Sequence, residues 1–210
     1  MDKILEDIVT TATEELRDLM EARDDALNKA RRARMLSKQA IQYLNSKQTK
    51  KAENILKEAS KLLKGIIKFS EPRTELQFFN QVETARQEYS EASILFSLSI
   101  NGGFPRPEEL EVPYTDYLMG LADVPGELRR QTLNHLQEEE MEQAKRNLEH
   151  MEEIFLNLTA MEEGSLLLKG MRRKMDIIRM VNEKTLADIT NELSRQKLSQ
   201  KLEELRHRLK

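Results

Sequence analysis

The sequence predicts an all-α protein, a single domain (residues 1–210) built as a bundle of about six to seven long helices. Charged residues make up 34% of the chain and aromatic residues only 5%, and such a composition favours helices over strands. There are only 7 Gly and 5 Pro, so few residues interrupt a helix. Apolar side chains recur every three or four positions, which is the period of an amphipathic helix.

The first half of the chain contains three predicted helices. The first starts near the N-terminus and is expected to reach about Leu44, followed by a polar turn at residues 45–50. The second is predicted from about Thr49 to Phe69, and the Ser-Glu-Pro-Arg sequence at 70–73 predicts the next break. The third is predicted from Glu75 to Ile100, where Asn-Gly-Gly ends it.

The second half begins with a proline-rich loop at residues 104–113. A helix from Tyr114 to about Leu136 is predicted next, with a disturbance at the Val-Pro-Gly sequence 124–126. Another helix is predicted from Glu138 to about Met161.

The last predicted helix runs from Ser165 to near the C-terminus. From about residue 194 to 210 its apolar residues form a narrow stripe, which suits a partner helix better than a thick core. We interpret this C-terminal extension as a packing or subunit contact.

Several classes of protein are disfavoured by composition. Without cysteine there is no disulfide, no thiolate zinc site and no cysteine nucleophile. No apolar run approaches the roughly 20 residues that span a bilayer, and the N-terminus is acidic where a signal peptide is basic. We therefore expect a cytoplasmic protein that does not enter membranes. The net charge of −3 does not by itself indicate nucleic-acid binding.

Two pairs of acidic residues are candidates for chemistry. Glu88 and Glu91 lie within about 60° of each other on a helical wheel, and carboxylate oxygens are the ligands that Mg²⁺ and Mn²⁺ prefer. The same pair is also typical of a solvated helix surface. Asp123 and Glu127 share a face if their helix is continuous. Alternatively, Asp123 is the N-cap of a new helix with Pro125 in its first turn.

The glutamate spacing is also similar to that of di-iron carboxylate bundles, which add Glu-x-x-His motifs. His135, His150 and His207 do not follow that spacing. We expect each histidine to be a surface residue.

The stretch VPYTDYLMGLADVPGELRR (112–130) resembles the most recognisable segment of the translin family, above all the archaeal-type branch of translin-associated factor X (Trax). The matching residues are Pro113, Asp116, Tyr117, Leu118, Gly120, Ala122, Asp123, Gly126, Glu127, Leu128 and Arg130. The sequence QEYSEA (87–92) is similar to the corresponding factor X pattern, and residues 170–189 resemble the family's closing basic helix. The likeness covers about residues 14–193.

This resemblance implies a translin-like helical subunit that assembles into a hollow homo-oligomer, an octamer, enclosing RNA or single-stranded DNA. For the factor X branch it implies a metal-dependent endoribonuclease with little sequence specificity. Carried over residue by residue, the catalytic and metal-binding positions are Glu88, Glu91, Asp123 and Glu127, with Mg²⁺ or Mn²⁺ as cofactor. A non-catalytic RNA-binding or single-stranded-DNA-binding protein and a coiled-coil scaffold are the alternatives. Pro125 departs from the family pattern and is expected to disturb the second acidic pair.

A basic stripe on the first helix is the candidate nucleic-acid contact. Arg31, Arg34 and Lys38 are predicted to share one face, opposite a face of small residues. Such a stripe binds phosphates without reading bases, although a solvated face serving solubility accounts for it equally well. Arg172, Arg173 and Lys174 form a second basic cluster with the same two interpretations.

Overall fold

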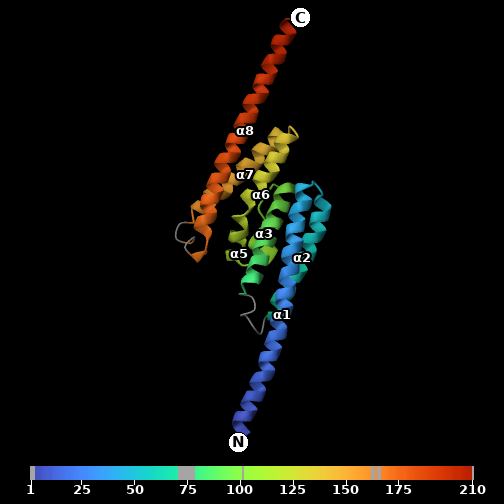
Figure 1. Cartoon of the computed structure of the whole chain (residues 1–210), viewed down its shortest axis with the longest axis vertical. Helices are drawn as coiled ribbons and strands as arrows, with labels where there is room; N and C mark the ends of the chain where they lie inside the picture. The colour runs from blue at the N-terminus through green and yellow to red at the C-terminus, as the bar shows by residue number, and fades with distance from the viewer. Residues whose placement is uncertain (1–2, 71–78, 101, 162–163, 165–166, 210) are drawn as a thin grey trace. The chain divides into compact units, whose positions relative to one another are not determined.

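The structure, a computed structural model, describes residues 3–70, 79–100, 102–161, 164 and 167–209. These residues form eight helices and no strand, which confirms the predicted all-α class (Figure 1). The chain divides into two compact units, Met1–Gly120 and Leu121–Lys210. The single-domain organisation stays a prediction from the sequence.

The first unit contains α1 (Lys3–Asn45), α2 (Thr49–Ser70), α3 (Asn80–Ile100), the short α4 (Pro107–Leu110) and most of α5 (Tyr114–Leu121). α1 packs against both α2 and α3. The face that it buries is made largely of alanine, which lets helix backbones approach closely because a methyl group fills little space. The alanines of α1 that are at most 1% exposed are Ala22, Ala26, Ala30, Ala33 and Ala40.

The predicted bounds of the first two helices agree with the structure to within about a residue. α3 starts later than predicted, because Phe79 lies outside the helix and its carbonyl accepts the N–H groups of Val82 and Glu83. The predicted start at Glu75, most of the predicted break at 70–73 and the predicted stop at Asn101 lie outside the described residues.

The second unit contains α6 (Val124–Gln137), α7 (Met141–Thr159) and α8 (Met171–Arg208), which pack against one another. The predicted helix start at Glu138 is wrong, because the chain turns at Glu139 (φ 61°) and α7 begins only at Met141. The start predicted near Ser165 is also too early among the described residues, since Gly170 (φ 91°) directly precedes α8. Ser165 itself lies outside the described residues.

Two helix ends expose apolar side chains. At the start of α1, Ile4, Ile8 and Leu16 are 57–68% exposed, and this part of the helix extends beyond α2 and α3 (Figure 1). Near the end of α8, the exposed side chains are Leu198, Leu202, Leu205 and Leu209. α8 is continuous into this C-terminal extension. None of the described helices is both long and apolar enough to cross a membrane.

Candidate functional site

Glu88 lies on the side of α3 that faces α1, where two basic residues meet it. Arg34 Nε lies 3.2 Å and Lys38 Nζ 3.3 Å from the same carboxylate oxygen, Oε1 of Glu88. The Glu88 side chain is only 18% exposed, whereas those of Arg34 and Lys38 are about half exposed. A predicted catalytic residue and two residues of the predicted basic stripe thus form one cluster, which the sequence did not predict.

Arg31, the third residue of the stripe, lies close to this cluster. It lines a small cavity of about 330 Å³ with Arg34 and with three polar residues of α3, namely Asn80, Gln81 and Thr84. Thr84 precedes Glu88 by four residues, so it lies one turn earlier on α3. Arg31 therefore shares a cavity between α1 and α3 with Arg34, which itself pairs with Glu88.

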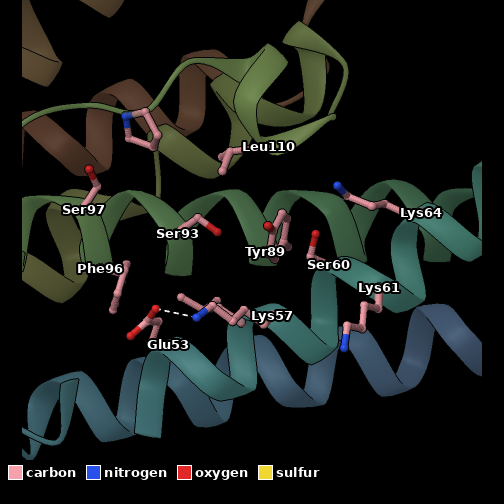
Figure 2. Close-up of a pocket in the computed structure, with 12 residues that line it drawn as sticks. Glu53, Lys57, Ser60, Lys61, Lys64, Tyr89, Ser93, Phe96, Ser97 and Leu110 are labelled. Atoms are coloured by element: carbon pink, nitrogen blue, oxygen red, sulfur yellow. Dashed lines mark hydrogen bonds and ion pairs between the residues drawn. The ribbon is translucent and has the colours of Figure 1, made fainter. Parts of the chain in front are cut away.

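A buried residue of α3, Tyr89, fixes the positions of Glu88 and Glu91. Tyr89 lies between the two glutamates in sequence and is only 7% exposed. It lines a separate cavity of about 530 Å³ towards α2, together with Lys57, Lys61 and other residues (Figure 2). Glu91 is partly buried. Glu88 and Glu91 therefore flank a buried residue of α3, so they cannot shift unless the buried side of α3 repacks.

α5 is fixed to the same turn of α3 by a buried ion pair. Arg86 Nε donates to Oδ2 of Asp116 at 2.5 Å, and both side chains are no more than 5% exposed. The amide of Gln87 also donates to Asp116, at 3.4 Å. Sequence reasoning assigned no role to Arg86 or to this pair; the one available signal was the place of Asp116 in the translin-like motif.

Gly120 brings α5 against the backbone of α3. A Cβ atom at this position would overlap the carbonyl oxygen of Gln87 and would lie 2.9 Å from Cβ of Ser90. Any side chain at residue 120 would therefore force α5 away from the segment that carries Glu88 and Glu91. Glycine is required here for close approach, not for a special φ angle.

The second acidic pair lies at the start of α6, in the second unit. Asp123 is the N-cap residue and Pro125 falls in the first turn, as one of the two sequence interpretations predicted. Its carboxylate makes no capping hydrogen bond and instead pairs with the ammonium of Lys174 on α8. Pro125 is accommodated by a helix start, because α5 has already ended at Leu121.

Glu127 lies in the first turn of α6 with its side chain 26% exposed. Its Oε2 is 3.9 Å from a guanidinium nitrogen of Arg130. A carboxylate in the first turn is favoured by the helix dipole. Asp123 and Glu127 thus belong to one helix start, not to the interior of a continuous helix.

The histidines are less exposed than predicted. The side chains of His135 and His150 are 19% and 22% exposed, and only His207 lies fully on the surface.

The four predicted site residues offer only carboxylate oxygens, the donor set of Mg²⁺ or Mn²⁺. The side chains of Glu88, Asp123 and Glu127 are 18%, 43% and 26% exposed, so a hydrated ion can reach them. Each of these three carboxylates also has a cation beside it. The chemistry available is therefore the binding of a divalent cation and of phosphate.

A family model described as the translin family matches residues 97–185. An uncharacterised protein of Methanocaldococcus jannaschii is 32% identical over 127 residues, which is 60% of this chain and 57% of that relative. The chain thus matches little more than half the length of this curated relative.

Three solved structures match over most of their length. AfC3PO in complex with duplex RNA is 31% identical, with a TM-score of 0.81 over 89% of this chain and 96% of the other. A second crystal structure, of AfC3PO, is 30% identical, with a TM-score of 0.80 over 89% of this chain and 97% of the other. Apo-NeC3PO is 26% identical, with a TM-score of 0.79 over 88% and 96%.

Proposed function

Because this chain belongs to the translin family, we propose that it binds RNA and cleaves it as a metal-dependent endoribonuclease of the factor X (Trax) type. The observation that carries the proposal is the meeting of Arg34 and Lys38 at Glu88. It places groups that bind phosphate beside a carboxylate that can bind a metal ion, and a phosphodiesterase needs both.

RNA is the favoured ligand for two reasons. AfC3PO, which is 31% identical, has been solved with duplex RNA. The exposed guanidinium of Arg34 and ammonium of Lys38 lie on a helix face with Arg31, and such cations bind phosphates of any sequence. Little sequence specificity follows from contacts of this kind; single-stranded DNA is the alternative ligand.

Glu88, Glu91, Asp123 and Glu127 would together hold one or two Mg²⁺ or Mn²⁺ ions. Glu88 and Glu91 lie three residues apart on α3, and Asp123 and Glu127 both lie at the start of α6.

A bound divalent ion would supply positive charge to the scissile phosphate and would lower the pKa of water. Arg34 and Lys38 pair with Glu88, and Lys174 pairs with Asp123. These basic side chains would bind the RNA phosphates, and the carboxylates would hold the metal ion. The buried Arg86–Asp116 pair and Tyr89 keep α3 and α5 in place.

The function is tested by incubating the protein with labelled single- and double-stranded RNA and DNA, with Mg²⁺, Mn²⁺ or a chelator. Glu91→Gln and Asp123→Asn should each lower RNA cleavage on the order of 100-fold or more while assembly is kept, because each removes a metal ligand. Matched controls are Glu142→Gln and Asp176→Asn, whose side chains are about three-quarters exposed. Undiminished cleavage by Glu91→Gln and Asp123→Asn would exclude these residues from the reaction.

A non-catalytic RNA- or single-stranded-DNA-binding protein is the second candidate. The ion pairs of Glu88 and Asp123 favour it, since both carboxylates are already neutralised without a metal ion. This candidate is distinguished by the wild-type protein in the same assay. Tight binding of RNA without cleavage under any of the divalent ions would support it.

We propose further that the chain acts as a homo-oligomer, an octameric shell. The support is the exposed apolar residues at the start of α1 and the end of α8, which no described part of the chain covers. Such stripes mark contacts with other helices.

A further inference from the structure

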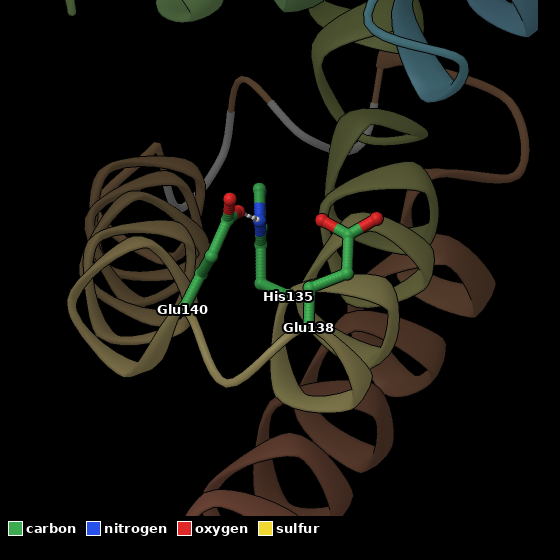
Figure 3. A group of neighbouring side chains, drawn as sticks. All are labelled: His135, Glu138 and Glu140. Atoms are coloured by element: carbon green, nitrogen blue, oxygen red, sulfur yellow. Dashed lines mark hydrogen bonds and ion pairs between the residues drawn. The ribbon is translucent and has the colours of Figure 1, made fainter.

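The turn between α6 and α7 gathers a histidine and two carboxylates within six residues. The possible ligand atoms of His135, Glu138 and Glu140 all lie within 4.8 Å of one another. Nδ1 of His135 is 2.6 Å from Oε2 of Glu140, and in the view of Figure 3 the imidazole lies between the two carboxylates. This cluster, which we call the α6–α7 turn cluster, shares no residue with the proposed RNA site.

The backbone of the turn produces this arrangement. Glu138 is the C-cap of α6 and Glu140 the N-cap of α7. Glu139 between them adopts a left-handed conformation, with φ 61°. It lines a cavity beside α8 with Glu192 and Arg195. The middle glutamate of the run is thus drawn towards α8, while its two neighbours lie beside His135.

The charges in the turn favour a bound cation. Glu138 lies at the C-terminal end of α6, where the helix dipole disfavours negative charge. Glu140 lies at a helix start, but its side chain makes no capping hydrogen bond and lies instead beside His135. Two carboxylates held within 4.8 Å of each other repel. A cation between them would turn this repulsion into attraction.

We propose that the α6–α7 turn cluster binds a divalent transition-metal ion of the Zn²⁺ kind. The imidazole distinguishes it from the carboxylate-only site proposed for Mg²⁺, because nitrogen ligands favour Zn²⁺, Co²⁺ and Ni²⁺. Metal–ligand distances near 2.0–2.2 Å place tetrahedral donors about 3.3 Å apart. Glu140, whose side chain is 39% exposed, can rotate to reach that distance. The ion would brace the turn that joins α6 to α7.

The test is binding of Zn²⁺, measured by calorimetry on the full chain in millimolar Mg²⁺ so that the carboxylate-only site is saturated. We expect one Zn²⁺ per chain in the wild-type protein. His135→Ala should weaken binding at least about 10-fold, because it removes a direct ligand. Co²⁺ should give a visible absorption band in the wild type that His135→Ala lacks. Zn²⁺ should also raise the melting temperature of the wild type but not of the variant.

The matched control is His150→Ala. His150 lies on α7 with similar exposure, and Oε2 of its partner Glu153 is 3.8 Å from its Nδ1. Its removal should leave Zn²⁺ affinity unchanged. If His135→Ala does not fold, Glu138→Gln and Glu140→Gln decide instead, and each should weaken binding. Absence of Zn²⁺ binding, or affinity kept in the His135 or glutamate variants, would overturn the proposal.

Discussion

Arg34 Nε donates a hydrogen bond to Oε1 of Glu88 across 3.2 Å, joining α1 to α3. Because these two residues are 54 positions apart, the contact exists only in the folded unit. It brings Arg34, which is predicted to bind nucleic acid, into contact with Glu88, which is predicted to act in catalysis. Neither role can therefore be altered without a consequence for the other.

The first prediction concerns RNA binding by Arg34. Arg34→Ala should weaken RNA binding several-fold and lower the salt dependence of the affinity by about one unit of slope, because one phosphate contact is lost. Fluorescence anisotropy at several salt concentrations measures both quantities. Arg32→Ala is the control, since Arg32 has similar exposure on the same helix but pairs with Glu58. Equal losses in the two variants would mean that Arg34 has no special place in the RNA site.

The second prediction concerns the approach of α5 to α3. Gly120→Ala should lower the free energy of unfolding by about 1–3 kcal/mol, because its methyl group overlaps the backbone of Gln87. Urea denaturation measures the change. Gly126→Ala in α6 is the matched control: nothing lies within 4 Å of its added methyl group. That variant should be neutral or stabilised by up to about 1 kcal/mol. A neutral Gly120→Ala would contradict the close approach.

The third prediction concerns the buried ion pair of Arg86 and Asp116. Asp116→Ala should lower the free energy of unfolding by about 3–5 kcal/mol, because it removes the carboxylate that pairs with the buried guanidinium of Arg86. The double variant Arg86→Met with Asp116→Leu should cost less than Asp116→Ala alone, since no charge remains buried.

Asp188→Ala is the control for this measurement. Its partner Arg129 is 2.9 Å away, but the Asp188 side chain is 40% exposed. Asp188→Ala should therefore lower the free energy of unfolding by no more than about 1 kcal/mol. If Asp116→Ala and Asp188→Ala lower the free energy of unfolding equally in urea denaturation, burial adds nothing to the contribution of the Arg86–Asp116 pair to stability.

The fourth prediction concerns stability at high pH. Burial, and then the charge of Glu109, raise the pKa of Tyr117 from 10.0 to about 12. The Tyr117 hydroxyl donates to the carbonyl of Pro105 at 2.7 Å. The folded chain thus resists deprotonation more than the unfolded chain does. The contribution of the neutral Tyr117 hydroxyl to the free energy of unfolding is complete below pH 10 and is lost as the pH rises towards about 12.

Tyr117→Phe should remove the ionisation near pH 12 from a spectrophotometric titration of tyrosine, and should reduce the loss of stability between pH 10 and 12. Tyr114→Phe is the comparison. Tyr114 is exposed, and its hydrogen bond to Glu108 raises the pKa of its hydroxyl. If Tyr117→Phe leaves the titration curve unchanged, the buried hydroxyl does not have the raised pKa.

The fifth prediction concerns assembly through the end of α8. Replacing Leu202 and Leu205, both more than half exposed, by serine should lower the sedimentation mass at micromolar concentration, because apolar area available to another subunit is lost. Lys201→Ser in the same turn is the control and should keep the mass of the wild type. An unchanged mass in the leucine variant would remove α8 from the proposed contacts.

The long helices could be predicted from the sequence because their stripes are local and periodic. The start predicted at Glu138 was wrong because the turn depends on Glu139, a left-handed residue that is not a glycine. The start predicted near Ser165 was too early because Gly170, with φ 91°, directly precedes α8. Asp123 illustrates the same limit for the site. Its N-cap position could be predicted from Pro125, but its pairing with Lys174 could not, because the two residues are 51 positions apart.

The buried Arg86–Asp116 pair shows a further reason. Arg86 looks like a solvated residue in a charged helix, and only packing against α5 makes it internal. Contacts between helices depend on the distance between their axes, which helical periodicity alone does not specify.

The row of alanines on α1 sets the distance between the axis of this helix and those of its neighbours. Ala30 and Ala33 are fully buried, so α1 and its neighbours can approach only because these side chains end in a single methyl group. Arg34 follows Ala33 directly and must reach Glu88 on α3. A larger residue at position 33 would widen the gap and separate that pair, although neither partner had changed. Conservation of the smallest side chains in such a helix can therefore preserve chemistry, even though an alanine takes no part in a reaction.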